Sequence, residues 1–186
     1  MTDVQMSTAE DVVSYLKAQH EAIKALFDRV ARAKGAQRKE EFVALRRVLA
    51  VHETAEEEIV HPRAKRELPN GERVVAARLK EENEAKEALA RLEKLDVDSA
   101  EFEAAFEALR TDVIAHAEAE EHEEFTQLAA QLDDSQLERM RKAAQLAEAM
   151  APTRPHAGAE SAAANMLVGP FAAMVDRTRD LISGKR

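Results

Sequence analysis

Two short segments of the sequence place a histidine four residues before a glutamate. His52 and Glu56 form the first pair, and His116 and Glu120 form the second. Because residues four apart lie on the same face of a helix, each pair presents an imidazole and a carboxylate side by side. This combination suits iron and manganese, and less specifically zinc, and a carboxylate can also bridge two ions. The two pairs therefore predict a metal site.

The two pairs belong to an approximate internal repeat. The segment HETAEE, which begins at His52, aligns with the segment HAEAEE, which begins at His116, at a separation of 64 residues. Ahead of the pairs, His20 and Glu82 lie 62 residues apart at matching places in the first and third helical segments. Two helix pairs related by a pseudo-twofold axis would place two equivalent ligand sets around one centre. The repeat therefore favours a site for two ions over a site for one.

Helical periodicity indicates how these residues reach one centre. Apolar residues recur every three or four positions in four long segments, and ionisable residues interrupt each apolar stripe. The second stripe contains Phe42, Leu45, Leu49, His52, Glu56 and Ile59. The interruptions in the other stripes are His20, then Arg78 with Glu82, then His116 with Glu120. Burying such groups is costly unless they are paired or neutralised, so we expect either a bound metal or a hydrogen-bonded network among them.

Glycine, proline and capping residues divide the chain into helices. The expected helices cover about residues 7–35, 37–68, 72–95, 98–132 and 133–150, and the first opens at a capping box in Ser7–Glu10. Four long helices joined by short turns predict an all-α, antiparallel up-down-up-down four-helix bundle with additional C-terminal helices. The predicted units are the bundle at 1–132, an accessory helix at 133–150, a linker at 151–165 and an amphipathic helix at 166–183.

Composition excludes several classes of protein. The 186 residues include no cysteine, five glycines and 4% aromatic residues, and the formal net charge is −9. The lack of cysteine excludes thiolate metal sites and fits a cytoplasmic location. The acidity argues against nucleic-acid binding, and no apolar run is long enough to cross a membrane. We expect no stable membrane association, and the C-terminal helix is expected to dock on the bundle or to mediate a homodimer.

The order of the ionisable residues resembles the hemerythrin-like (HHE cation-binding) domain family. The resemblance covers about residues 10–132 and rests on the upstream histidine, the doubled His-x-x-x-Glu and the segment HETAEEEIVHP. It implies a four-helix bundle that holds two non-haem iron ions, bridged by carboxylates and by an oxo or hydroxo group. By position, Glu56 and Glu120 would be the bridging carboxylates, and His20, His52 and His116 would be terminal ligands.

The sequence departs from the family pattern on the third helix, where Glu82 occupies the position of a histidine. Glu82 can ligate a metal there, or a solvent-derived ligand or Glu81 fills the position; neither Arg78 nor Lys86 can act as a ligand. Because anionic oxygen donors stabilise ferric iron, the departure favours reaction with dioxygen or peroxide, of an oxidase or catalase type, over reversible oxygen carriage. The alternatives are iron or zinc storage or buffering without turnover, and a metal-free helical interaction module.

Other ionisable residues near the two pairs are expected to lie outside the metal site. His61 and His122 fall off the helical stripes. The flanking acids are expected at the surface, with Glu53 the best placed of them to reach a metal; the other two are Glu57 and Glu121. Tyr15, the only tyrosine, is expected to be partly buried.

Overall fold

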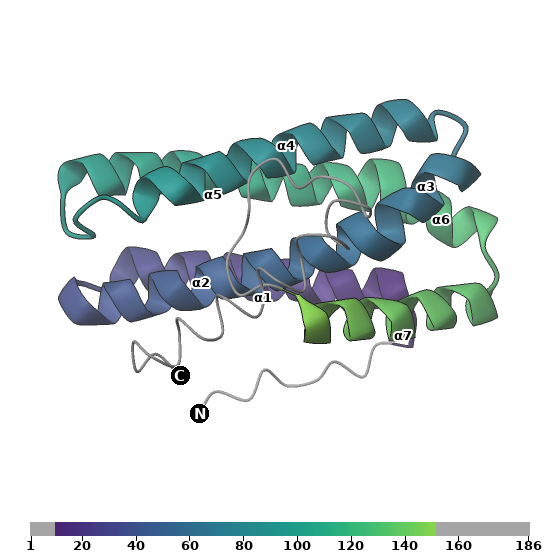
Figure 1. The fold of residues 1–186 in the computed structure, drawn as a ribbon, viewed down its shortest axis with the longest axis horizontal. Coiled ribbons are helices and arrows are strands. Elements are labelled where there is room, and N and C mark those ends of the chain that lie inside the picture. The colour runs from purple at the N-terminus through teal and green to yellow at the C-terminus, as the bar shows by residue number, and fades with distance from the viewer. Residues whose placement is uncertain (1–9, 152–186) are drawn as a thin grey trace.

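The computed structural model describes residues 10–151, and the regular structure in that range is entirely helical (Figure 1). The prediction of an all-α protein is therefore confirmed for these residues. The elements are α1 (Val12–Arg32), α2 (Gly35–Ala55), η1 (Glu56–Val60), α3 (His61–Glu67), α4 (Gly71–Leu92), α5 (Ala100–Ala119), η2 (Glu120–Phe125), α6 (Thr126–Gln131) and α7 (Asp134–Met150). The predicted C-terminal helix at 166–183, and all of the predicted linker after Ala151, lie outside the described residues.

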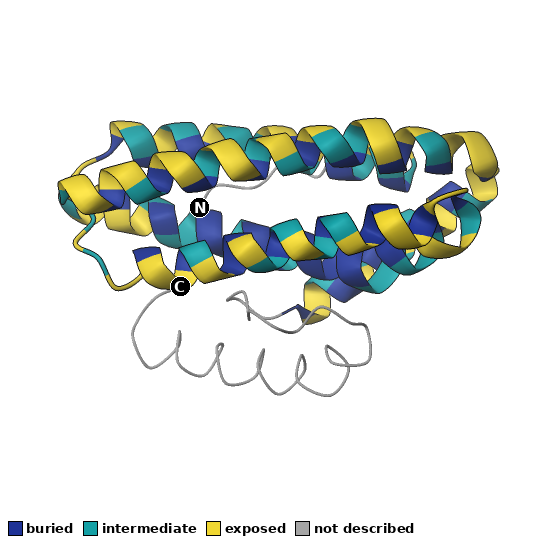
Figure 2. Cartoon of the chain, turned by 90° about the horizontal axis from the view of Figure 1, so that it is seen from above, coloured by how far each residue is buried: buried dark blue, intermediate teal, exposed yellow. Residues whose placement is uncertain are grey.

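The long helices α1, α2, α4 and α5 run with their axes close to parallel (Figure 1). α1 packs against α2, α4 packs against α5, and α1 also contacts α5. α7 packs along both α1 and α2. Figure 2 shows that the buried faces of the long helices turn toward one another, so they enclose a common interior. Within the described part of the chain, no helix contains an apolar stretch of the length that a membrane span requires.

Local sequence signals set the starts of three helices. Asp11 caps α1 by accepting a hydrogen bond from the backbone N–H of Ser14 at 2.9 Å. The helix therefore begins after Asp11, and the capping box expected in Ser7–Glu10 does not open it; residues 7–9 lie outside the described range. Ser99 caps α5, and Asp133 opens α7 with a capping box.

Two glycines are required by the turns that connect the long helices. Gly35 has a φ of 55°, a conformation that side chains rarely adopt, and its N–H donates to the Asp98 carboxylate at 3.0 Å. A Cβ atom at Gly71 would clash with the carbonyl oxygens of Ala64 and Lys65. The close approach of α3 to the start of α4 therefore depends on a residue without a side chain.

The ionisable residues of the apolar stripes lie between two apolar clusters. On α1, His20 lies between Leu16, which belongs to one cluster, and Ile23, which belongs to the other. On α4, Glu82 lies in the same way between Val75 and Ala85. The polar side chains therefore form a layer across the middle of the bundle, with apolar packing above and below it.

Candidate metal centre

Each His-x-x-x-Glu pair runs directly into a π-helical turn. η1 begins at Glu56 and η2 begins at Glu120, so the two long helices expected at 37–68 and 98–132 are each interrupted. A π turn contains more residues than an α turn, so the residues after it face a direction that α-helical periodicity does not predict. In the second stripe, the sequence predicted that Ile59 would be buried. Ile59 is only partly buried, and its neighbour Val60 is fully buried instead. Such turns are frequent at functional sites.

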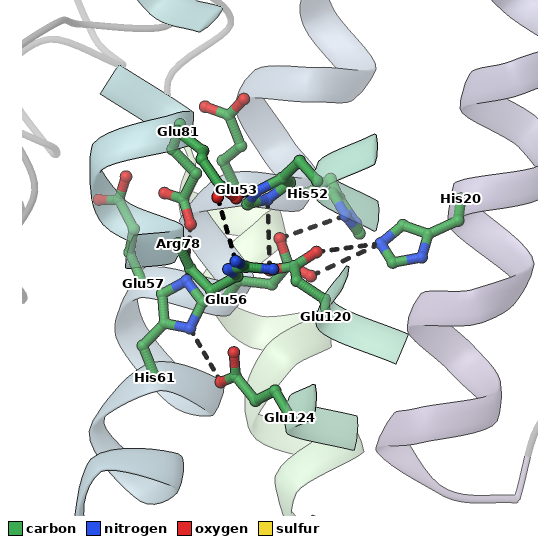
Figure 3. A network of polar contacts seen from close by, with 12 residues as sticks. His20, His52, Glu53, Glu56, Glu57, His61, Arg78, Glu81, Glu120 and Glu124 are labelled. Carbon is green, nitrogen blue, oxygen red and sulfur yellow. Dashed lines mark hydrogen bonds and ion pairs between the residues drawn. The ribbon is translucent and has the colours of Figure 1, made fainter. Parts of the chain in front are cut away.

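The first cluster of potential ligands consists of His20, His52, Glu56 and Glu120. All of them are buried, and each offers a nitrogen or oxygen atom within 4.8 Å of those of the others. His20 Nε2 lies 3.4 Å from Glu120 Oε2 and 3.8 Å from Glu56 Oε1 (Figure 3). His52 Nε2 lies 3.2 Å from Glu56 Oε2. Residues from α1, α2, η1 and η2 therefore meet at one point.

The second cluster consists of Glu56, Glu82, His116 and Glu120, whose ligand atoms also lie within 4.8 Å of one another. Glu56 and Glu120 belong to both clusters. His116 Nε2 lies 3.3 Å from Glu120 Oε1, and the Glu82 side chain is fully buried. The structure thus brings together the residues that the sequence proposed as ligands, including Glu82 on α4.

The donor atoms of the two clusters fit a metal ion better than they fit one another. Seven of them are buried and have no hydrogen-bond partner, namely His20 Nε2, both carboxylate oxygens of Glu56 and of Glu120, Glu82 Oε2 and His116 Nε2. Buried polar atoms are normally hydrogen-bonded, so each of these requires an explanation. Ligands at about 2.1 Å from an octahedral ion lie about 3.0 Å apart. The imidazole-to-carboxylate separations of 3.2–3.8 Å are close to that spacing.

The charges within the clusters also favour a bound cation. Burial, together with the charge of Glu120, raises the pKa of Glu56 to about 8. Burial alone would raise the pKa of Glu120 as well, but His116 and His20 outweigh it and hold that pKa well below its usual value. Burial and the charge of neighbouring His20 lower the pKa of His52 well below its usual value. A cation bound at each cluster would take the place of the protons that these groups now hold and would offset the charges of the carboxylates.

The imidazole rings turn Nε2 toward the clusters and Nδ1 away from them. Nδ1 of His52 donates to Gln19 Oε1 at 2.7 Å, and Nδ1 of His116 donates to Glu81 Oε2 at 2.9 Å. His20 Nδ1 donates to Glu121 at 2.9 Å. Such partners fix the orientation and tautomer of metal-binding histidines. Glu81 therefore lies outside the second cluster, as the hydrogen-bond partner of the ligand candidate His116.

Three residues that were predicted to lie away from the site are buried beside it, so those predictions are wrong. His61 was expected to face away from the site. The π turn η1 changes the direction of α3, so that Nε2 of His61 donates to Glu82 Oε1 at 2.6 Å. Glu53 and Glu57 were expected at the surface, but both pack around the buried ammonium group of Lys86. The charge of Lys86 compensates for the charges of these buried carboxylates.

Glu124 was not predicted from the sequence as part of the site. This residue is fully buried, accepts a hydrogen bond from His61 Nδ1 at 3.0 Å (Figure 3), and forms a third group of potential ligands with His61 and Glu120. Its spacing of four residues from Glu120 is a signal that could have identified it. His122 is exposed and Tyr15 is partly buried, and both observations match the predictions.

A pocket connects the two clusters with the space between the long helices. It is lined by the ligand candidates His20, His52, Glu82 and His116, and by apolar side chains that include Ile23, Leu49 and Val113. These residues come from α1, α2, α4 and α5, so the pocket enters the bundle between those helices. The arrangement leaves room for a small ligand beside His116 and Glu82 of the second cluster.

Comparison with known protein families identifies a cation-binding family, in agreement with the candidate metal site. The Hemerythrin HHE cation binding domain family matches residues 11–128, which include both clusters and both π turns. Searches of curated proteins and of solved structures gave no significant match. The family match spans more than half of the chain, and the matched segment carries the buried histidines and glutamates just described. The chain therefore belongs to the hemerythrin HHE cation-binding domain family.

Proposed function

We propose that the chain holds a non-haem di-iron centre and uses it to react with dioxygen or hydrogen peroxide. The observation that carries this proposal is the sharing of Glu56 and Glu120 between two clusters whose remaining donors are histidines and one further glutamate. Two carboxylates that each belong to two ligand sets are suited to bridging a pair of ions. The proposal includes alternating directions for the four long helices, which the short connections between them favour.

The residues of the two clusters would take different roles as metal ligands. Glu56 and Glu120 would bridge the ions. His20 and His52 would complete the first position, and His116 and Glu82 would complete the second. When bound, iron supplies the electrons that an oxygen–oxygen bond accepts. The chain holds the ligands in place through the partners of their Nδ1 atoms, and the flanking apolar clusters exclude bulk water.

The composition of the second cluster favours reaction over reversible oxygen carriage. Glu82 brings a third carboxylate into that cluster, where the family pattern has a neutral imidazole. Anionic oxygen ligands stabilise the higher oxidation state of iron, so a centre of this kind gives up electrons readily and returns to the ferrous state less readily. The pocket beside His116 and Glu82 admits a ligand of the size of dioxygen or peroxide.

The experiment that tests this proposal mixes the ferrous-loaded protein with dioxygen and, separately, with hydrogen peroxide. We expect rapid oxidation, followed as near-ultraviolet absorption of ferric iron, and repeated consumption of peroxide. A His116→Ala variant should lose most of this activity, whereas His122→Ala, which alters an exposed histidine in η2, should retain it. Stable and reversible oxygen binding through many cycles would contradict the proposal.

A second outcome of the same experiment distinguishes storage from catalysis. A protein that takes up two iron ions and oxidises them once, without consuming further peroxide, would be a storage or buffering protein. A protein that binds zinc alone, or no metal, would overturn the di-iron assignment. The metal content of the wild-type protein therefore has to be measured in the same samples as the reaction.

A further inference from the structure

The internal repeat extends to the hydrogen bonds around the metal-site histidines. Residues on α1 correspond to residues on α4 at an offset of 62, and residues on α2 and η1 correspond to residues on α5 and η2 at an offset of 64. Gln19 accepts a hydrogen bond from His52 at 2.7 Å, and its counterpart Glu81 accepts one from His116 at 2.9 Å. The two halves therefore use the same positions for the same contact.

This correspondence changes at the one position where the two ligand sets differ. His20 in the first half corresponds to Glu82 in the second. His20 Nδ1 donates to Glu121 at 2.9 Å, whereas an ionised Glu82 has no hydrogen to donate to Glu57, the counterpart of Glu121. Lys86, instead of Glu82, donates the hydrogen bond to Glu57. The ammonium group of Lys86 also lies 3.7 Å from Glu82 Oε2.

The residues that pack on His20 and on Glu82 also correspond to each other and also differ. The ring of Phe125 stacks on the ring of His20, with 5.6 Å between ring centroids and 12° between ring planes. The counterpart of Phe125 is His61, whose Nε2 donates to Glu82 Oε1 at 2.6 Å. An apolar ring therefore packs on the imidazole, and a hydrogen-bond donor contacts the carboxylate.

The surroundings of His61 leave only one oxygen of Glu82 available to a metal. Glu82 Oε1 accepts the hydrogen bond from His61, and Glu82 Oε2 has no hydrogen-bond partner. The other nitrogen of His61 donates to Glu124 at 3.0 Å, so both sides of the ring are fixed. The residue reaches this place because the π turn η1 precedes it. A ring held in this way sets the direction of the free oxygen.

We propose that His61 is the positioning residue that allows Glu82 to replace a histidine in the second cluster, and that the two residues form a matched pair. The inference rests on the proposed two-metal centre and adds to it a residue that acts through Glu82 without touching the ion. His61 holds Glu82 Oε1 and presents Glu82 Oε2 to the second ion. In the first half, His20 needs no such donor, and Phe125 occupies the equivalent position.

The test is a calorimetric titration of the full chain with ferrous iron in the absence of oxygen. In a His61→Phe variant we expect the affinity of one of the two ions to fall by about 10–100-fold, the effect typical of losing a residue that orients a ligand. The other ion should bind as in the wild type. His122→Ala provides a matched control, since it removes an exposed histidine from the equivalent part of the other half.

The decisive variant combines His61→Phe with Glu82→His. It recreates on the second half the packing of Phe125 on His20, so we expect it to bind the second ion more tightly than either single variant. If His61→Phe binds both ions with wild-type affinity, or if the double variant binds no better than His61→Phe, the proposal is overturned. The second result is also the one expected if His61 were itself a ligand.

Two further measurements keep the result unambiguous. Circular dichroism of each metal-free variant reports folding, and His61→Gln, which retains one side-chain donor, should lose less affinity than His61→Phe; an equal loss would contradict the proposal. Failure of the two-metal centre itself is recognised separately, because the wild-type protein would then bind fewer than two ions. If the wild type binds two ions and the His61 variants bind both ions equally well, the role of His61 is overturned while the two-metal centre stands.

Discussion

The first cluster contains two imidazoles and two carboxylates, whereas the second contains one imidazole and three carboxylates. They share Glu56 and Glu120, and equivalent helices of the repeat supply the remaining ligand candidates. The difference shows that a repeated backbone does not require repeated chemistry. One altered ligand position, Glu82, is accompanied by altered neighbours. His61 donates a hydrogen bond to Glu82 and the ammonium group of Lys86 lies near it, whereas His20 has an apolar ring and a hydrogen-bond acceptor beside it.

The shared carboxylates provide the largest expected effect, since a change in one of them acts on both clusters. In Glu120→Gln we expect both ions to be lost, because the substitution weakens a ligand common to the two sets. Elemental analysis after iron loading and desalting measures the result. Glu118→Gln, an exposed neighbour on the same helix, should keep the wild-type metal content. Retention of both ions in Glu120→Gln would show that the carboxylate is not shared.

Ligands that belong to one cluster should affect one ion only. His52→Ala should remove the ion at the first cluster, and His116→Ala should remove the ion at the second, because each imidazole belongs to a single set. Titration with ferrous iron in the absence of oxygen should give one ion per chain for each variant. If either variant loses both ions or neither, the division into two clusters is incorrect.

Much of the division of ligand candidates into two clusters could be predicted from the sequence, because it depends on the α-helical periodicity that precedes the π turns. The spacing of His20 from Leu16 and Ile23, and of Glu82 from Val75 and Ala85, places both side chains in the interior. Periodicity fails after Glu56 and Glu120, where π turns change the direction of every later residue. For that reason the burial of His61 was not predicted.

The acidic residues beside the site were misjudged for a different reason. Glu53 and Glu57 belong to a run of charges that is typical of a solvent-exposed face, and their burial depends on a cation supplied by another helix. Lys86 lies one helical turn after Glu82, on the face that the stripe marks as buried. That position could have indicated a buried ion pair, but only a three-dimensional arrangement shows which carboxylates it reaches.

The charges within the clusters also predict that the free energy of unfolding of the metal-free protein depends on pH. Burial raises the pKa of Glu56 from 4.5 to about 8. The neighbouring carboxylates outweigh burial and raise the pKa of His20 from 6.5 to about 10. These groups hold protons more tightly in the folded state, so the free energy of unfolding should fall as the pH rises from 6.5 to 8.

Thermal unfolding of the metal-free and iron-loaded proteins measures this effect. We expect the midpoint of the metal-free form to be a few degrees lower at the higher pH. Because a metal binds the deprotonated ligands, the iron-loaded form should show no such decrease. The decrease should be smaller in metal-free Glu56→Gln, which lacks that titrating group. A metal-free midpoint that rises over this interval would contradict the assignment of these protonation states.

The smallest expected effect concerns the partners of the two equivalent histidines. His116 donates to the carboxylate of Glu81, whereas His52 donates to the neutral amide of Gln19. Glu81→Gln makes the two halves alike, and we expect it to weaken the second ion by about tenfold or less and to leave the first unchanged. Calorimetric titration compares the two affinities, and Glu87→Gln, at an exposed position on the same helix, is the control. Equal weakening of both ions would argue against a local effect of Glu81.

The most direct test of the two-metal centre is anomalous X-ray diffraction from crystals of the iron-loaded protein, recorded at the iron absorption edge. We expect two anomalous peaks separated by about 3.5–4 Å, with Glu56 and Glu120 between them. One peak should adjoin His20 and His52, and the other should adjoin His116 and Glu82. A single peak, or a peak held by His61 and Glu124 in place of the second cluster, would contradict it.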